Sequence, residues 1–214
     1  MKKIKHSCRF LIIFALSVFV LSACESKDDK ISSLIKGRVK ETLSNPDSYQ
    51  PVETIIDSLK NDRYGDTLIL DNSLKSIEAR RKFTNAEKMF YEKRDIVNDY
   101  LNSTTATNKD MDAINNEKQK MDEYLKDMDT QGAIIKSLET EIKAYDKKCD
   151  GKFYGWLVTH KFNYVSKDGE PSSGTYILFV DKDYRKVYRV LDEDKNRYDG
   201  VKLYLDGLMK GLIK

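Results

Sequence analysis

The stretch Phe153–Val165, FYGWLVTHKFNYV, alternates large apolar or aromatic residues with other residues along its length. A period of two places every second side chain on the same face of a β-strand. One face of the predicted strand carries six residues: Tyr154, Trp156, Val158, His160, Phe162 and Tyr164. The elements around this predicted strand are interpreted from it outward.

Two more strand patterns follow. Lys167-Asp168-Gly169 and Pro171 predict a turn, and Thr175–Val180 (TYILFV) predicts the second strand. Asp181-Lys182-Asp183 predicts another turn before Lys186–Leu191 (KVYRVL). The three strands form a predicted antiparallel meander.

A helical pattern precedes the meander. Residues 73–147 contain no proline and one glycine, and they are rich in alternating charges. Apolar residues recur at helical spacing on both sides of the polar segment 102–108. They are Phe83, Ala86, Phe90, Val97 and Leu101 before it, and Ile114, Met121, Met128, Ile135 and Ile142 after it. The companion positions after the break are mostly polar or small: Lys118, Leu125, Gly132 and Glu139. One apolar heptad position is too weak for a freestanding coiled coil, so we predict an antiparallel helical hairpin that bends at Gly132.

The remaining segments complete an α+β fold. Lys30–Ser44 predicts a helix that Asn45-Pro46-Asp47 ends, Val52–Leu59 predicts a strand, and Asp66–Leu70 predicts a weaker one. The last residues predict a helix with one apolar face: Val201, Tyr204, Leu205, Leu208, Leu212 and Ile213. We expect a small antiparallel sheet covered by the N- and C-terminal helices. Its domain comprises residues 31–72 and 150–214, and residues 73–149 are the inserted hairpin.

The N-terminus predicts export. Residues 1–9 carry four basic and no acidic side chains, and Phe10–Val20 is almost entirely apolar. A basic start followed by an apolar run of this length is typical of a secretory signal peptide. The apolar run is too short to span a bilayer as a helix. The run ends in Leu21-Ser22-Ala23-Cys24, which resembles the lipobox of bacterial lipoproteins. The resemblance implies cleavage after residue 23 and acyl chains on Cys24. An ordinary secreted protein with a chance cysteine is the alternative.

Two further resemblances point to an outer-membrane location. The residues Lys27, Asp28 and Asp29 in the expected tether, residues 24–30, resemble the surface-export signal of Bacteroidota-type lipoproteins; a plain solvated tether is the alternative. The segments 45–52 (NPDSYQPV) and 155–162 (GWLVTHKF) resemble parts of small uncharacterised lipoproteins of the same type. This second resemblance covers the α+β part and implies a fold but no activity.

Composition narrows the function classes. Removing residues 1–23 changes the formal charge from +3 to −1, which argues against nucleic acid as a partner. Cys149 is the only cysteine after Cys24, so no internal disulfide is expected in the mature chain. No catalytic motif is recognisable, and no cofactor or metal is expected. The calcium-loop opening Asp192–Asn196 lacks the glycine and glutamate that an EF-hand needs, because Arg197 and Leu203 stand there.

The leading hypothesis is a lipid-anchored, non-enzymatic interaction or scaffold protein that binds a protein partner through the hairpin. The alternative is a small-molecule or glycan binding module that uses the aromatic strand, with Tyr154, Trp156 and His160 as the candidate ligand residues. An enzyme of unknown class is the third possibility.

Overall fold

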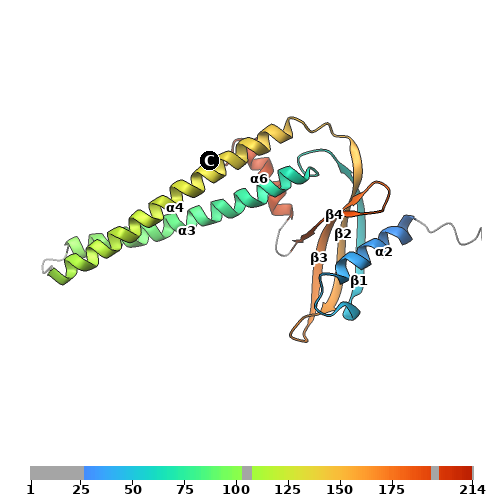
Figure 1. Ribbon diagram of the computed structural model, residues 1–214, viewed down its shortest axis with the longest axis horizontal. Coiled ribbons are helices and arrows are strands. Elements are labelled where there is room, and N and C mark those ends of the chain that lie inside the picture. Colours follow the sequence, from blue (N-terminus) through green and yellow to red (C-terminus); the bar gives the residue numbers. More distant parts are fainter. Residues whose placement is uncertain (1–26, 103–107, 194–197, 214) are drawn as a thin grey trace, which may run out of the picture. The chain divides into compact units, whose positions relative to one another are not determined.

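The computed structural model describes residues 27–102, 108–193 and 198–213. The chain divides into two compact units: residues 1–57 with 155–191, and residues 58–154 with 192–214. We call these the sheet unit and the hairpin unit (Figure 1). The mixed α+β fold is confirmed. The signal segment and the lipobox with Cys24 lie outside the described residues, as do residues 194–197 of the rejected calcium loop.

Four antiparallel strands form one sheet in the order β1-β2-β3-β4. The strands are β1 (Gln50–Lys60), β2 (Phe153–Val165), β3 (Pro171–Asp181) and β4 (Val187–Asp192). The predicted meander is confirmed, and β1 joins it beside β2. In the register of β2 and β3, Trp156 lies opposite Val180 and His160 lies opposite Tyr176. Pro171 begins β3, although the sequence pattern assigned it to the preceding turn.

The turn between β2 and β3 depends on a glycine. The backbone N–H of Ser166 donates to the carbonyl of Glu170 at 2.8 Å, and that of Gly169 donates to the carbonyl of Ser166 at 3.1 Å. Gly169 has a φ of +83°, which a residue with a Cβ adopts only with strain. This local geometry confirms the turn predicted at Lys167-Asp168-Gly169.

Helix α2 (Lys27–Lys40) covers one face of the sheet within the sheet unit. Its spacing of four brings three apolar side chains onto one stripe. The buried cluster contains Ile31, Ile35 and Val39 of α2 with Val158, Phe162, Leu178 and Val180 of the sheet. The helix begins at Lys27 and ends at Lys40, so it is shifted toward the N-terminus relative to the predicted Lys30–Ser44. Leu43 still packs against this cluster from the turn that follows the helix.

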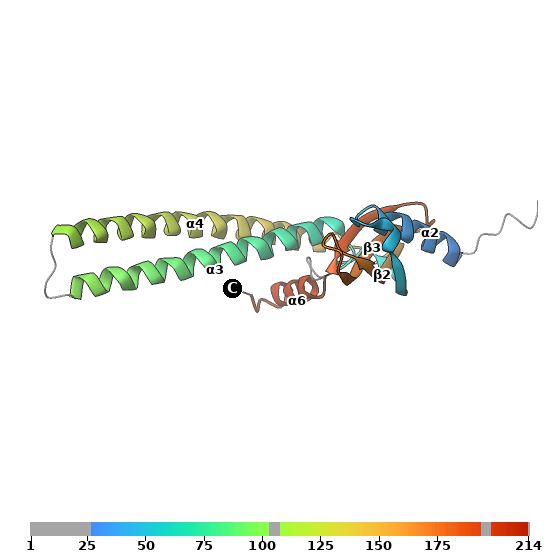
Figure 2. The same cartoon turned by 90° about the horizontal axis from the view of Figure 1, so that it is seen from below.

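The hairpin consists of α3 (Thr67–Asn102) and α4 (Asn108–Asp146), which lie side by side along their length (Figures 1 and 2). At 1.5 Å per residue the helices are about 54 and 58 Å long. The predicted strand Asp66–Leu70 is wrong. The Asp66 carboxylate accepts hydrogen bonds from the N–H groups of Leu68 and Ile69 at 2.8 and 2.9 Å. Asp66 therefore caps the first turn of α3. The apolar residues that follow it, Ile69 and Leu70, are buried in that first turn.

The predicted bend at Gly132 is also wrong. Gly132 lies inside the continuous helix α4, and the chain reverses between Asn102 and Asn108. A single glycine weakens a helix by about 1 kcal/mol relative to alanine and does not break it when the flanking residues are good helix formers.

The C-terminal helix α6 (Tyr198–Met209) belongs to the hairpin unit and packs against α3. The Glu193 carboxylate accepts hydrogen bonds from the N–H groups of Tyr198 and Asp199 at 2.8 and 3.3 Å, which caps the helix start. The predicted apolar face is buried at four positions: Val201, Tyr204, Leu205 and Leu208. Leu212 and Ile213 follow the end of the helix, and Leu212 is exposed.

Candidate docking surface on the hairpin

Two rows of buried or half-buried residues run along each helix with the seven-residue spacing of a helix contact. The α3 rows are Ile69, Ser76, Phe83, Phe90 and Val97, with Asn72, Ala79, Ala86, Lys93 and Tyr100, and all of these side chains are buried or half-buried. On α4 the predicted row Ile114, Met121, Met128, Ile135 and Ile142 is likewise buried or half-buried. The second row on α4 begins three residues after Ile114, whereas the sequence pattern placed it four residues after. Its members are Glu117, Tyr124, Gln131, Leu138 and Tyr145. Leu125, a member of the predicted second row, is 42% exposed.

Charged side chains occupy the contact near its distal end. The Lys93 ammonium lies 3.1 Å from Glu117 Oε2, across the two helices. Lys120 also pairs with Glu117, at 2.6 Å. These two lysines, Lys120 first, lower the pKa of the Glu117 carboxyl. A polar pair between helices fixes which residues face one another, at a cost in stability.

A groove with a volume of about 540 Å³ lies between α3 and α4. Phe83 and Ile135, both half-buried, provide its apolar lining. Gly132 lies among them, and a Cβ on Gly132 would meet Phe83 Cε2 at 3.9 Å, an ordinary contact. The glycine is therefore not required by local packing, and its small size leaves the groove open.

The charges around this groove differ between the two helices. Arg80 of α3 is paired with Glu139, which also accepts a hydrogen bond from the Tyr204 hydroxyl at 3.1 Å. Lys136 and Lys143, one heptad apart on α4, line the groove without an ion pair to any described residue. With Glu87 as the remaining acid, the groove lining has one more basic than acidic side chain. It therefore favours a ligand with an apolar face and negative charge.

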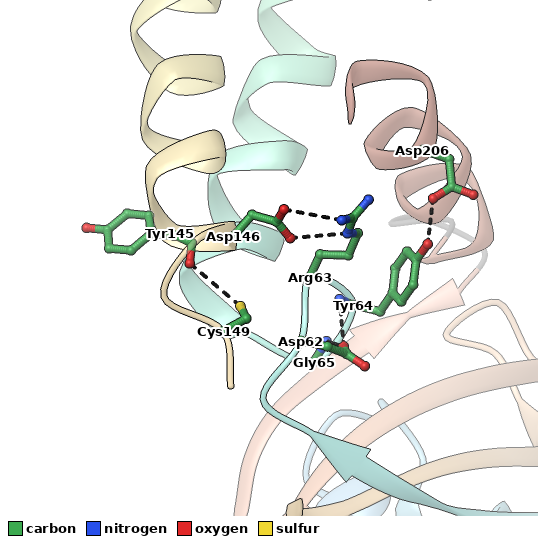
Figure 3. A network of polar contacts seen from close by, with 8 residues as sticks. All are labelled: Asp62, Arg63, Tyr64, Gly65, Tyr145, Asp146, Cys149 and Asp206. Atoms are coloured by element: carbon green, nitrogen blue, oxygen red, sulfur yellow. Dashed lines mark hydrogen bonds and ion pairs between the residues drawn. The ribbon is translucent and has the colours of Figure 1, made fainter. Parts of the chain in front are cut away.

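A polar network holds the base of the hairpin (Figure 3). Arg63 forms a two-pronged ion pair with Asp146 at the end of α4, with its closest contact at 3.1 Å. The Tyr64 hydroxyl donates to Asp206 of α6 at 2.5 Å. Gly65 allows the chain to turn here, because a Cβ would lie 2.0 Å from the Lys60 carbonyl oxygen. These bonds fix the entry and exit of the hairpin and have a structural role.

Cys149 lies at the edge of the same network (Figure 3). Its thiol is half-buried and donates to the Tyr145 carbonyl at 3.6 Å. Burial and the negative charges of Asp66, Asp146 and Asp62 raise the pKa of the thiol. A raised pKa reduces the thiolate fraction and with it the nucleophilicity. The environment therefore favours a structural thiol.

The predicted ligand residues on the aromatic strand make contacts inside their own units. The Tyr154 hydroxyl donates to the Gly65 carbonyl in the hairpin unit. In the sheet unit, Trp156 stacks on Tyr184 with ring centroids 5.4 Å apart, and its indole N–H donates to the Lys182 carbonyl at 3.2 Å. Both residues are thus engaged in holding turns and strand ends together.

His160, the third predicted ligand residue, is 2% exposed. Its Nε2 lies 2.7 Å from the Tyr49 hydroxyl and its Nδ1 lies 2.8 Å from Thr54 Oγ1. One hydroxyl donates to the neutral ring and the other accepts from it. Burial lowers the pKa of His160, which keeps the ring uncharged at neutral pH. Tyr49 and Thr54 carried no sequence signal for this role, because they lie more than a hundred residues away along the chain.

Comparisons with known proteins identify no relative: no family model, no curated protein and no solved structure matches the chain. Among residues 27–102, 108–193 and 198–213, no helix has the length and apolarity required to cross a bilayer. Within the same residues, His, Cys, Asp and Glu do not gather into a group of three able to hold a metal ion.

Proposed function

We propose that this chain is a lipid-anchored lipoprotein of the bacterial cell envelope that binds a protein partner on its helical hairpin. The observation that carries the proposal is the groove between α3 and α4 at Phe83, Gly132 and Ile135, which combines an apolar lining with basic side chains. The fitting occupant is an amphipathic helix of the partner. Its apolar face would lie over Phe83 and Ile135, and acidic side chains would pair with Lys136 and Lys143.

The groove is better supported as the interaction site than the aromatic strand. Tyr154, Trp156 and His160 all have hydrogen-bond partners within the chain, so a glycan or small molecule that used them would have to displace those partners. A ligand that paired with the exposed groove residues Lys136 and Lys143 would not have to displace an ion-pair partner among the described residues.

Two matched threonines test the proposal in intact cells. Thr140 lines the groove and Thr130 does not, and both are exposed with Oγ1 bonded at 2.8 Å to the carbonyl four residues earlier. A photo-crosslinking amino acid replaces each in turn. We expect a discrete covalent adduct from position 140 and none from position 130.

Filling the groove should remove that adduct. Gly132→Leu places a side chain against Phe83, whereas Gly132→Ala adds only a Cβ at an ordinary contact distance. We expect the adduct at position 140 to disappear with leucine and to persist with alanine. Equal adducts at both threonines, or an adduct unaffected by leucine, would contradict docking in the groove.

The anchor is tested separately. Cys24→Ser removes the sulfur that the acyl chains require, so we expect the chain to move from the membrane fraction to the soluble fraction. Protease treatment of intact cells then tests the export signal Lys27, Asp28 and Asp29. Degradation of the wild-type chain supports a location on the outer face of the outer membrane; protection of the chain in intact cells but not in lysed cells places it inside the envelope.

A further inference from the structure

Strand β1 forms one edge of the sheet, and its outer side has no partner strand among the described residues. Most of its side chains are exposed. Two of them are large and apolar: Val52, which is 59% exposed, and Ile55, which is 45% exposed. An edge strand of this kind presents unpaired backbone N–H and C=O groups and is a template for another extended segment.

A cavity of about 280 Å³ adjoins this edge, between α2 and β1 in the sheet unit. Hydroxyl groups and one ammonium group provide most of its polar lining: Ser32, Ser33, Lys36, Tyr49, Thr54 and His160. The His160 ring already has partners for both nitrogens. The groups left to meet a ligand are therefore the two serine hydroxyls and the Lys36 ammonium, all on the exposed side of α2.

The charge of the Lys36 side chain favours an anionic group in the cavity. No Asp or Glu lines it, and Lys36 forms no ion pair with any described residue. The neighbouring acid on β1, Glu53, pairs with Lys161 at 2.7 Å. Because successive strand residues point to opposite faces, Glu53 lies on the face away from Thr54 and the cavity. A carboxylate in the cavity would thus meet a cation and hydroxyl donors without a competing acid.

We propose that β1 accepts an extended peptide segment of a partner protein as a fifth strand, with an acidic side chain of that segment in the cavity beside Lys36. Backbone pairing along β1 would supply affinity, and the cavity would supply specificity, which is how strand addition to a sheet edge divides these tasks. Val52 and Ile55, on opposite faces of β1, would each gain a cross-strand neighbour. This site is separate from the hairpin groove and does not depend on the proposed docking there.

Fluorescence anisotropy of a labelled peptide tests the proposal with the full mature chain in detergent micelles. The probe is Thr-Val-Thr-Glu-Thr-Val-Thr, which favours an extended conformation and places one glutamate at its centre. We expect saturable binding, and binding at least about tenfold weaker when lysine replaces the glutamate, since a tenfold change corresponds to about 1.4 kcal/mol.

Two lysines of α2 provide the matched variants on the protein. Lys36→Glu places a negative charge at the cavity, whereas Lys30→Glu makes the same charge change on the same helix at an exposed residue that does not line the cavity. We expect Lys36→Glu to weaken binding of the glutamate peptide about tenfold or more and to reverse the preference toward the lysine peptide. Lys30→Glu should leave both affinities nearly unchanged.

Four outcomes would overturn the proposal. The first is absence of saturable binding of the glutamate peptide. The second is undiminished binding of the same peptide with alternate backbone nitrogens methylated, which would exclude pairing along β1. The third is binding of N-acetylglutamate amide as tight as that of the glutamate peptide, which would show that the cavity binds a small carboxylic acid without strand pairing. The last is self-association of the chain that the peptide does not reverse, which would show a second copy on this edge.

Discussion

The two units of this chain, each considered by itself, differ in the polar side chains that accompany their apolar cores. The cluster under α2 in the sheet unit is apolar and aromatic, and its one buried polar side chain, His160, has a partner at each nitrogen. The hairpin unit contains the other three buried polar side chains of the described residues: Asn72, Ser73 and Ser76. It also has the Lys93–Glu117 pair in its helix contact. Both units therefore bury apolar side chains, and the additional polar groups of the hairpin unit restrict how its helices align.

The chain provides a separate reporter for each unit. Trp156 is its single tryptophan and lies in the sheet unit, so tryptophan fluorescence follows that unit. Far-UV circular dichroism at 222 nm follows mainly α3 and α4, which are the longest helices. Denaturant unfolding recorded with both signals separates the effects on the two units.

Truncating the sheet core should have the largest effect. Phe162 is 1% exposed, and its ring contacts those of Tyr49, His160, Tyr164 and Tyr176. Phe162→Ala should lower the free energy of unfolding by about 3–5 kcal/mol, because it removes buried area and leaves a cavity. The fluorescence transition should move to lower denaturant. Phe83→Ala in the half-buried hairpin groove is the matched control, and an equal loss from both variants would contradict the comparison.

An intermediate effect of opposite sign is expected for the charged pair in the hairpin. Lys93 and Glu117 are 20% and 14% exposed, so both are partly desolvated. Replacing both with leucine should raise the free energy of unfolding and move the circular dichroism transition to higher denaturant, because apolar packing replaces a partly desolvated pair.

The single variant sharpens this test. Glu117→Leu removes the partner of both Lys93 and Lys120, and we expect it to be less stable than the wild type. Destabilisation by the double variant as well would show that the pair stabilises the hairpin and does not merely align it.

The last test concerns the pH dependence of the sheet unit. The pKa of His160 is lowered from 6.5 by burial, so the unfolded chain binds a proton at a higher pH than the folded chain does. The free energy of unfolding should therefore fall as the pH decreases below 6.5, by at most about 1.4 kcal/mol per pH unit. His160→Gln should abolish this slope in the fluorescence transition. A slope of the same size in that variant would assign it to carboxylates.

Much of the fold could be predicted because periodicity reports burial directly. The alternation in Phe153–Val165 gives the strand and its buried face, and the seven-residue spacing from Ile114 to Ile142 gives one row of the helix contact. Asp66–Leu70 was misassigned because a short apolar run fits a strand or a helix start equally well. The Asp66 cap decides between them, and its hydrogen bonds are visible only in three dimensions.

The candidate sites were less predictable than the fold. The polar side chains Glu117 and Gln131 alternate with Tyr124, Leu138 and Tyr145 in the second row of α4, so the apolar pattern of this row is interrupted and its spacing is hard to recognise. The groove arises from Gly132 opposite Phe83, and the cavity arises from α2 beside Thr54. Each depends on residues brought together from distant parts of the sequence, and a single sequence does not show which distant residues meet.

The connection at the base of the hairpin has a consequence for the order of folding. The N–H of Asn61 donates to the Lys152 carbonyl at 2.8 Å, and the N–H of Gly151 donates to the Asn61 carbonyl at 2.9 Å. These residues are about ninety positions apart in sequence. Joining them directly would require closing a long loop, whereas prior pairing of α3 with α4 shortens the flexible loop to a few residues and lowers the entropic cost by roughly 2–3 kcal/mol. We therefore expect the hairpin to form first and to deliver β1 and β2 to each other.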